Sequence, residues 1–225
     1  MVATKKMQNK ITAAAKDVLL APVYLYQGHK IKRDTVRLPE PNGERHGQVQ
    51  LNNSPITSKG KSNNILNLMV VGDSAAAGVG SQTQQEALVG HLIPILTEQA
   101  AIQSAFDTLN WSLQATTGYT SFDILRRLYV LPAPSQPIDV MVLSVGVNDT
   151  TSKVSAAQWQ QQIENIIAIA QRKFGVRELV FLSLPPMAQM PAIPVPLNNF
   201  VGAKAAILDN SLQQICAAHD NVTYM

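Results

Sequence analysis

The fold is decided by the stretch Ile65-Leu66-Asn67-Leu68-Met69-Val70-Val71-Gly72-Asp73-Ser74. An apolar run of strand length ends abruptly at Gly72-Asp73-Ser74, and a run of small residues follows it. A strand that is apolar at both odd and even positions is typical of a parallel sheet covered on both faces. Such a strand carries Ser74 to the rim of the sheet, where rigid backbone holds a hydroxyl within reach of a substrate.

From residue 65 onward, strand-like and helix-like segments alternate. Strands are expected at 65–71, 108–115, 138–145, 178–184 and 221–225, and helices near 84–103, 121–130, 156–174 and 198–218. This order predicts an open, doubly wound α/β sheet of five parallel strands. In the strand order 2-1-3-4-5 the first three strands are neighbours, so the loops after them would meet at one edge of the sheet.

Two of the helical segments allow detailed predictions. Ser155 and Gln158 form a capping-box pair before the helix at 156–174, and Gly175 is expected to end it. Its apolar face consists of Trp159, Ile163, Ile166, Ile167 and Ala170. Pro94 is expected to kink or split the helix near 84–103. The core positions expected there are Leu88, Leu92, Ile95 and Leu96.

Composition sets limits on the class of protein. No apolar stretch of the 225 residues reaches the roughly 18–20 residues that a membrane span needs. The single cysteine, Cys216, excludes an internal disulfide and is expected to fill the core. That usage fits a reducing compartment, so a cytoplasmic protein is expected, with peripheral attachment to a membrane left open. Few aromatic residues and the lack of a recognition motif argue against nucleic-acid binding.

The first 64 residues form a basic N-terminal arm ahead of the domain expected at 65–225. Residues 1–61 hold eleven Lys/Arg against four Asp/Glu, a net charge of +7, whereas the remainder carries −4. The arm is either simply solvated or makes a weak contact with an anionic membrane surface. A helix is expected at 1–17 and loop at 28–64, with room for a short edge strand. The apolar patch at 18–26 is expected to lie on the domain or on a membrane surface, because Lys16-Asp17 and Pro22 do not suit a signal peptide.

Three polar loops directly follow the first three expected strands. They contain Gly72-Asp73-Ser74, the run Thr116 to Thr120 with Gly118 inside it, and Gly146-Val147-Asn148-Asp149. Each alone reads as a turn or a helix cap. Together they supply what acyl transfer needs: the Ser74 hydroxyl as nucleophile, and the Ser74 N–H, the Gly118 N–H and the Asn148 amide as oxyanion donors. Asp73 and Asp149 are interpreted as residues that brace the loops.

These motifs resemble those of the SGNH hydrolases, also called GDSL esterases or lipases. The resemblance covers about residues 65–225 and rests on Val70-Val71-Gly72-Asp73-Ser74, on Gly118 and on Gly146-Val147-Asn148-Asp149. It implies a flavodoxin-like three-layer α/β/α fold and hydrolysis of carboxylic esters through a serine acyl-enzyme. It implies Ser74 as the nucleophile, Gly118 and Asn148 in the oxyanion hole, and neither a metal nor an organic cofactor. The stretch from Arg37 to Glu40 lies outside it and has no assigned function.

The sequence departs from the family pattern at the general base. The family's histidine lies in an Asp-x-x-His motif after the fifth strand, and no such motif follows Asn148 here. None of the histidines present, His29, His46, His91 and His219, is expected to replace it. We therefore expect a truncated version of a longer hydrolase. Without a last helix, apolar surface near the first and third strands would lie bare, so self-association is also expected.

The main hypothesis is a serine esterase that acts on short acyl esters of small molecules, with sugar O-acetyl esters and lipid esters also open. The alternative is a non-catalytic relative that keeps the fold and pocket as a binding module. A third hypothesis, a phosphate or nucleotide binder that uses Gly78-Val79-Gly80, is weaker because a dinucleotide fingerprint needs a third glycine and an acidic residue.

Overall fold

A computed structural model describes residues 2–51 and 64–225 of the chain, with side chains described from residue 15 onward. Met1 and residues 52–63 lie outside the described residues, and so does the part of the expected loop at 28–64 that falls on them.

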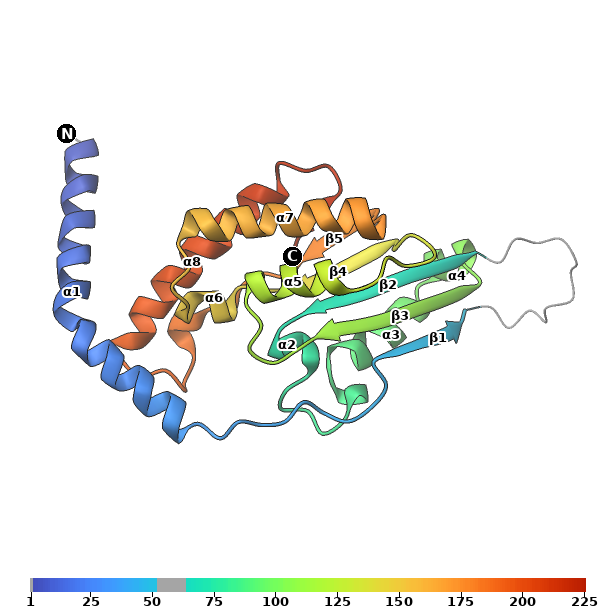
Figure 1. Ribbon diagram of the computed structural model, residues 1–225, viewed down its shortest axis with the longest axis horizontal. Helices are drawn as coiled ribbons and strands as arrows, with labels where there is room; N and C mark the ends of the chain where they lie inside the picture. Colours follow the sequence, from blue (N-terminus) through green and yellow to red (C-terminus); the bar gives the residue numbers. More distant parts are fainter. Residues whose placement is uncertain (1, 52–63) are drawn as a thin grey trace, which may run out of the picture.

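One six-stranded sheet forms the centre of the protein (Figure 1). Its strands are β1 His46–Gln50, β2 Ile65–Gly72, β3 Thr108–Ala115, β4 Val140–Ser144, β5 Glu178–Phe181 and β6 Val222–Tyr224. The spatial order is β1-β3-β2-β4-β5-β6, and β2 to β6 run parallel. The five parallel strands thus have the predicted order 2-1-3-4-5. The predicted strand number was one too low, because β1 of the arm pairs antiparallel with β3 at the edge.

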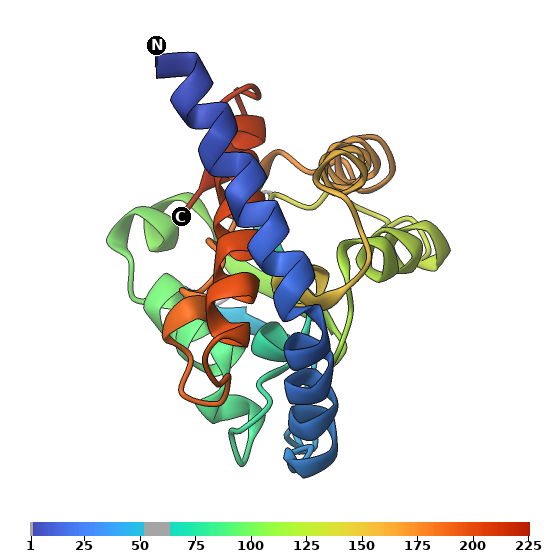
Figure 2. The same cartoon turned by 90° about the vertical axis from the view of Figure 1, so that its left-hand side faces the viewer.

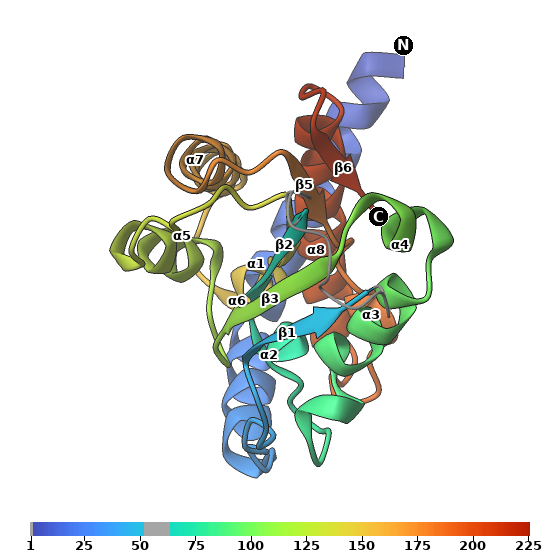
Figure 3. The ribbon, with the colours of Figure 1, turned by 90° about the vertical axis from the view of Figure 1, so that its right-hand side faces the viewer.

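Helices flank the sheet on both faces, which gives the three-layer α/β/α architecture. They are α1 Val2–Asp34, α2 Ser74–Ala77, α3 Leu88–Thr97, α4 Ala100–Ala105, α5 Ser121–Val130, α6 Val147–Thr151, α7 Ala156–Phe174 and α8 Leu197–Cys216, with short 3₁₀ turns at Gln84–Glu86 and Met187–Gln189. Figure 3 shows α5 and α7 on one side of the sheet and α3 and α4 on the other.

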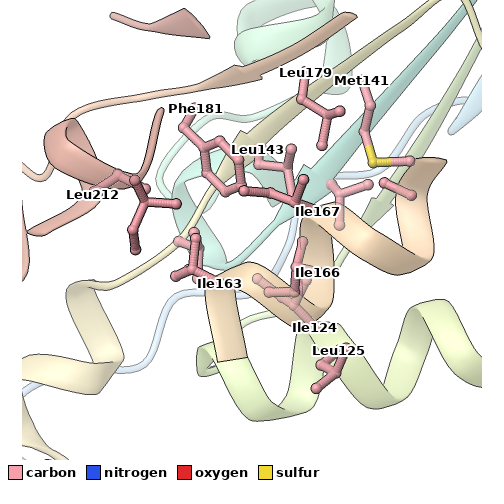
Figure 4. Close-up of a cluster of buried hydrophobic side chains, with 14 of the residues drawn as sticks. Ile124, Leu125, Met141, Leu143, Ile163, Ile166, Ile167, Leu179, Phe181 and Leu212 are labelled. Atoms are coloured by element: carbon pink, nitrogen blue, oxygen red, sulfur yellow. The ribbon is translucent and has the colours of Figure 1, made fainter. Parts of the chain in front are cut away.

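Helix α7 packs one apolar face into the larger hydrophobic core. Ser155 and Gln158 form the expected capping box, and Gly175 closes the helix in the left-handed conformation at φ +61°. All five residues of its expected apolar face are buried. Figure 4 shows Ile163 and Ile167 directed towards Leu143 and Phe181 of the sheet. Cys216 is also buried in this cluster, as expected, and burial raises the pKa of its thiol to about 11.

The expected helix near 84–103 is broken into a 3₁₀ turn and two helices. The break follows Thr97 rather than Pro94, which lies inside α3. Ile95 is 57% exposed, so its assignment to the core was wrong. Val89 and Ile93 are buried instead, and residues four apart share one face of a helix. Ile95 stands two positions beyond Ile93 and therefore points away from that face.

The arm differs most from expectation. A single helix, α1, continues to Asp34 despite Pro22, so residues 28–34 are helical rather than loop. Figure 2 shows α1 bending partway along as it passes α8, and a proline within a helix is a usual cause of such a bend. Contacts with α8 hold the helix past the proline. Tyr24 stacks on Phe200 with ring centroids 4.8 Å apart, and the Gln27 amide donates to the Val195 carbonyl at 2.8 Å.

An apolar groove runs along β2, β4 and β5 beside α3. Its volume is about 680 Å³, and it is lined mainly by Leu66, Leu68, Leu92, Val142, Val180 and Met225. It places apolar surface beside the first and third parallel strands, where the sequence led us to expect it.

The expected self-association stays a prediction. An accessible apolar groove favours contact between copies, because burying it removes apolar area from water. We predict a concentration-dependent rise in the mass measured by light scattering, and a reduced rise for Val180→Lys with an unchanged circular dichroism spectrum. A constant monomer mass over the same concentrations would contradict the prediction. Val130→Lys is the control, because Val130 is an exposed valine outside the groove.

Candidate active site

Ser74 is held at the end of β2 by the residue before it. Asp73 caps α2, and its Oδ1 accepts the Ala75 N–H at 3.0 Å. The Asp73 N–H donates to the Ser144 carbonyl at 3.3 Å, which ties this turn to the end of β4. Asp73 is 1% exposed, whereas Ser74 is half-buried. The nucleophile candidate therefore sits on a fixed turn but stays accessible.

Gly118 lies in a four-residue turn after β3. The Tyr119 N–H donates to the Thr116 carbonyl at 3.2 Å, and Gly118 has φ +86° at the third position. No non-glycine residue in the described chain has positive φ, so Thr117 has negative φ and the turn is of type II. A Cβ at Gly118 would meet nothing within 4 Å. The backbone conformation, and not lack of space, therefore requires glycine here.

Asn148 joins the three loops. It lies in α6 after β4, and its Nδ2 donates to the Tyr119 carbonyl at 2.9 Å. The same nitrogen is 3.5 Å from Asp73 Oδ2, at the limit for a hydrogen bond. The loops that follow β2, β3 and β4 thus meet, as the strand order predicted. Because the amide has two N–H groups and only one makes a short bond, the second can serve a ligand.

Asp149 forms a buried network beneath these loops. It is 1% exposed, and it accepts the Ser121 N–H at 3.0 Å and the Ser121 hydroxyl at 2.6 Å. The Ser121 Oγ is also 2.6 Å from Oε1 of Gln162 on α7. These bonds fix the start of α5 against α6, which agrees with the loop-bracing role expected of Asp149. The sequence reasoning did not identify Ser121 or Gln162 as its partners.

Burial dominates the electrostatics of the two aspartates. Desolvation raises the pKa of Asp73 above its usual value, and the nearby Asp149 carboxylate adds to that effect. Desolvation also raises the pKa of Asp149, against the opposing hydrogen bonds from Ser121. Lys204 faces this region from α8 and donates to the Ser152 carbonyl at 2.7 Å. Desolvation lowers its pKa, and the Asp149 charge partly offsets this.

Among the hydrogen bonds of the described residues, none joins a histidine to Ser74. His219 Nε2 is 3.0 Å from Glu164 Oε2 just before β6, at the rim opposite the site, as expected. His29 bonds the Leu25 carbonyl within α1, His91 is exposed on α3, and His46 lies in β1 opposite Ser112. Among the described residues, no cluster of three or more His, Cys, Asp or Glu side chains could hold a metal ion.

Solved structures similar to this chain share its architecture. They include TesA, with 25% identity, a TM-score of 0.51 and coverage of 68% of this chain and 73% of TesA. AlinE4, an SGNH-hydrolase family esterase, has 18% identity, a TM-score of 0.52 and coverage of 75% and 77%. A member of the lipolytic protein G-D-S-L family from Veillonella parvula has 13% identity, a TM-score of 0.52 and coverage of 71% and 76%.

Sequence comparison gives a consistent assignment. No curated protein matches the chain by sequence. The sequence model of the GDSL-like lipase/acylhydrolase family matches residues 70–225, a range that includes Ser74, Gly118 and Asn148 and begins within β2. With the three loops meeting at the carboxyl edge of the matched sheet, the chain belongs to the GDSL-like lipase/acylhydrolase family.

Proposed function

We propose that this protein hydrolyses carboxylic esters, preferentially short acyl esters of small molecules or lipids, through an acyl-enzyme on Ser74. The observation that carries the proposal is the position of Asn148, whose amide bonds the loop of Gly118 and approaches the residue before Ser74. These contacts bring the loops of Ser74, Gly118 and Asn148 together, which supports the proposal that all three supply oxyanion donors beside the accessible Ser74 hydroxyl. Family membership supports hydrolysis of this type, and the similar structures include esterases by name.

Each group has a defined task in the reaction. The Ser74 Oγ attacks the ester carbonyl carbon, and its proton passes to a base. The carbonyl oxygen becomes an oxyanion that accepts hydrogen bonds from the Ser74 N–H, the Gly118 N–H and the side-chain amide of Asn148. Collapse of the intermediate breaks the bond to the leaving alcohol, which takes up a proton. Water then attacks the acyl group, releases the acid and restores the serine.

The group that accepts the Ser74 proton is not identified among the described residues. No histidine hydrogen-bonds Ser74 in the described part of the chain, so imidazole added to the buffer is a suitable external base. A fluorophosphonate probe should then label Ser74, because the phosphonyl group forms the same bond to Oγ that an acyl group would. We expect labelling that rises with imidazole concentration and that peptide mapping places on Ser74. A folded protein that stays unlabelled at every imidazole concentration would contradict the esterase proposal.

The second candidate, a non-catalytic binding module, is favoured by the same positions of the histidines. It predicts that a stable phosphonate or carboxylate binds the oxyanion donors while Ser74 stays unmodified. Isothermal titration with a short-chain carboxylate, combined with the labelling experiment, separates the two functions. Binding without labelling would support the module, and labelling of Ser74 would exclude it.

Contact of α1 with a membrane surface also stays a prediction. No helix in the described part of the chain has the length and apolar content to cross a bilayer. Helix α1 nevertheless has an outward face with four exposed apolar side chains beside Lys16 and Lys30. They are Val18, Leu19, Leu25 and Tyr26, each 65–80% exposed. We predict weak, salt-sensitive sedimentation with phosphatidylglycerol vesicles and none with phosphatidylcholine vesicles. Equal sedimentation of wild type and Leu19→Asp/Leu25→Asp would contradict this role for the face.

A further inference from the structure

The segment between α1 and β1 contacts two of the three loops of the proposed oxyanion hole. We call residues Glu40–Arg45 the strap. Oε1 of Glu40 accepts the Thr117 N–H at 2.7 Å and the Thr117 hydroxyl at 2.8 Å. Its Oε2 accepts Nη1 of Arg45 at 2.8 Å. One carboxylate of the arm is thus bonded to the residue directly before Gly118.

The other end of the strap is fixed to β3. The second amino group of Arg45, Nη2, donates to the Ala115 carbonyl, and the Arg45 carbonyl accepts the Leu113 N–H at 2.7 Å. Because Ala115 is the last residue of β3, Arg45 anchors the strap immediately before the turn that contains Gly118. The Glu40 side chain, 29% exposed, is therefore held from two sides.

The strap also touches the loop that follows Ser74. The Asn42 carbonyl accepts the Gln84 N–H at 3.0 Å, and the Gln84 amide donates to the Ala77 carbonyl of α2 at 3.0 Å. A Cβ added to Gly78 would lie 3.1 Å from Pro41. The strap thus connects the end of the nucleophile helix to the turn that offers the second oxyanion donor.

The turn around Gly118 is the part that needs such support. Type I and type II turns differ mainly by a flip of the central peptide, here the one that joins Thr117 to Gly118. A flip would reverse the direction of the Gly118 N–H and remove it from the site. Thr116, Thr117 and Gly118 are all exposed, so neighbouring packing does little to hold this turn. The Glu40 carboxylate accepts hydrogen bonds from both the N–H and the hydroxyl of Thr117. These bonds restrain Thr117, the residue on one side of the peptide that would flip.

We propose that Glu40 is a positioning residue that keeps the Gly118 N–H aimed at the oxyanion, so that the arm is part of the active-site support. This rests on the proposed esterase function, because only that function gives the Gly118 N–H a catalytic task. Burial alone would raise the pKa of Glu40, but the hydrogen bonds of Thr117 and the Arg45 guanidinium outweigh it and lower the pKa. Glu40 is therefore a full acceptor at neutral pH.

The test compares Glu40→Ala with Glu44→Ala. Glu44 is an exposed glutamate of the same segment, without a hydrogen bond or ion pair among those described for the strap. With imidazole present, we expect Glu40→Ala to slow fluorophosphonate labelling of Ser74 about ten- to hundredfold. Glu44→Ala should leave the rate unchanged. Glu40→Gln keeps one acceptor oxygen for Thr117 and should recover part of the rate. If Glu40→Ala does not fold, Glu40→Gln replaces it as the test variant.

A second readout reports on the turn without any reaction. In protein labelled with ¹⁵N-glycine, the Gly118 amide is one resonance among those of only twelve glycines. Glu40→Ala should shift or broaden that resonance, whereas Glu44→Ala should not. A Glu40→Ala protein with a labelling rate within about twofold of wild type and an unchanged Gly118 resonance would overturn the proposal. If Ser74 is unreactive in every variant, the esterase function fails, and the Gly118 resonance still decides whether Glu40 orders the turn.

Discussion

Replacing Ser74 by alanine should reduce imidazole-supported hydrolysis of a short p-nitrophenyl ester to the rate of the same imidazole buffer without protein. The reason is that no other group can form the acyl-enzyme in this mechanism. Loss of a serine nucleophile removes the covalent route entirely, so we expect a decrease of about 10³-fold or more where a base is supplied. The measurement is the enzyme-dependent rate as a function of imidazole concentration.

The matched control is Ser81→Ala, which removes the same hydroxyl from the loop that follows α2. The Ser81 Oγ donates to the Glu86 carbonyl at 3.2 Å and has no task in the proposed reaction. It should keep the wild-type rate. If Ser74→Ala retained most of the activity while remaining folded, the nucleophile would lie elsewhere and the assignment of the site would be wrong.

Replacing Asn148 by alanine should lower the rate of Ser74 labelling by about 10²–10³-fold, the usual cost of losing one oxyanion donor. The change removes the side-chain N–H that is proposed to bind the oxyanion, whose nitrogen is 3.5 Å from Asp73 Oδ2, and also the 2.9 Å bond to the Tyr119 carbonyl. For an ester substrate, kcat should fall while KM changes little, because the oxyanion exists only in the transition state and the intermediate. The measurement is the second-order labelling rate together with the steady-state constants.

Asn210→Ala is the control for this second substitution. Its amide donates to the Ala206 carbonyl on the exposed side of α8, so the same chemical group is deleted away from the site. It should label like wild type. A rise in KM without a fall in kcat for Asn148→Ala would mean that Asn148 holds the substrate and does not stabilise charge.

The sequence predicted those parts of the fold that local chemistry determines. The bounds of α7 followed from the Ser155–Gln158 capping box and from Gly175, whose roles depend only on neighbours in the chain. The meeting of the loops after β2, β3 and β4 followed from the strand order alone. The first depends on residues close together in the sequence and the second on the order of the strands, and both can be inferred from the sequence pattern.

The rest depends on contacts between distant residues. Helix α1 continues past Pro22 because Tyr24 and Gln27 pack on the α8 region, more than 160 residues away in sequence. The contact between Glu40 and Thr117 joins positions 77 residues apart. Nothing in the composition around Glu40 marks it, because its role arises only when β1 aligns the arm on the edge of β3. The length of α1 and the position of Glu40 are thus determined by tertiary packing, which local sequence propensity does not show.

The most direct test of the account is to trap the acyl-enzyme. The protein would be mixed with p-nitrophenyl acetate and imidazole, quenched rapidly in acid, and digested for mass spectrometry. The account predicts one acetyl group on the peptide that contains Ser74, absent from Ser74→Ala and reduced in Asn148→Ala. Ester turnover by folded protein with no more acetyl group on the Ser74 peptide than Ser74→Ala carries would contradict it.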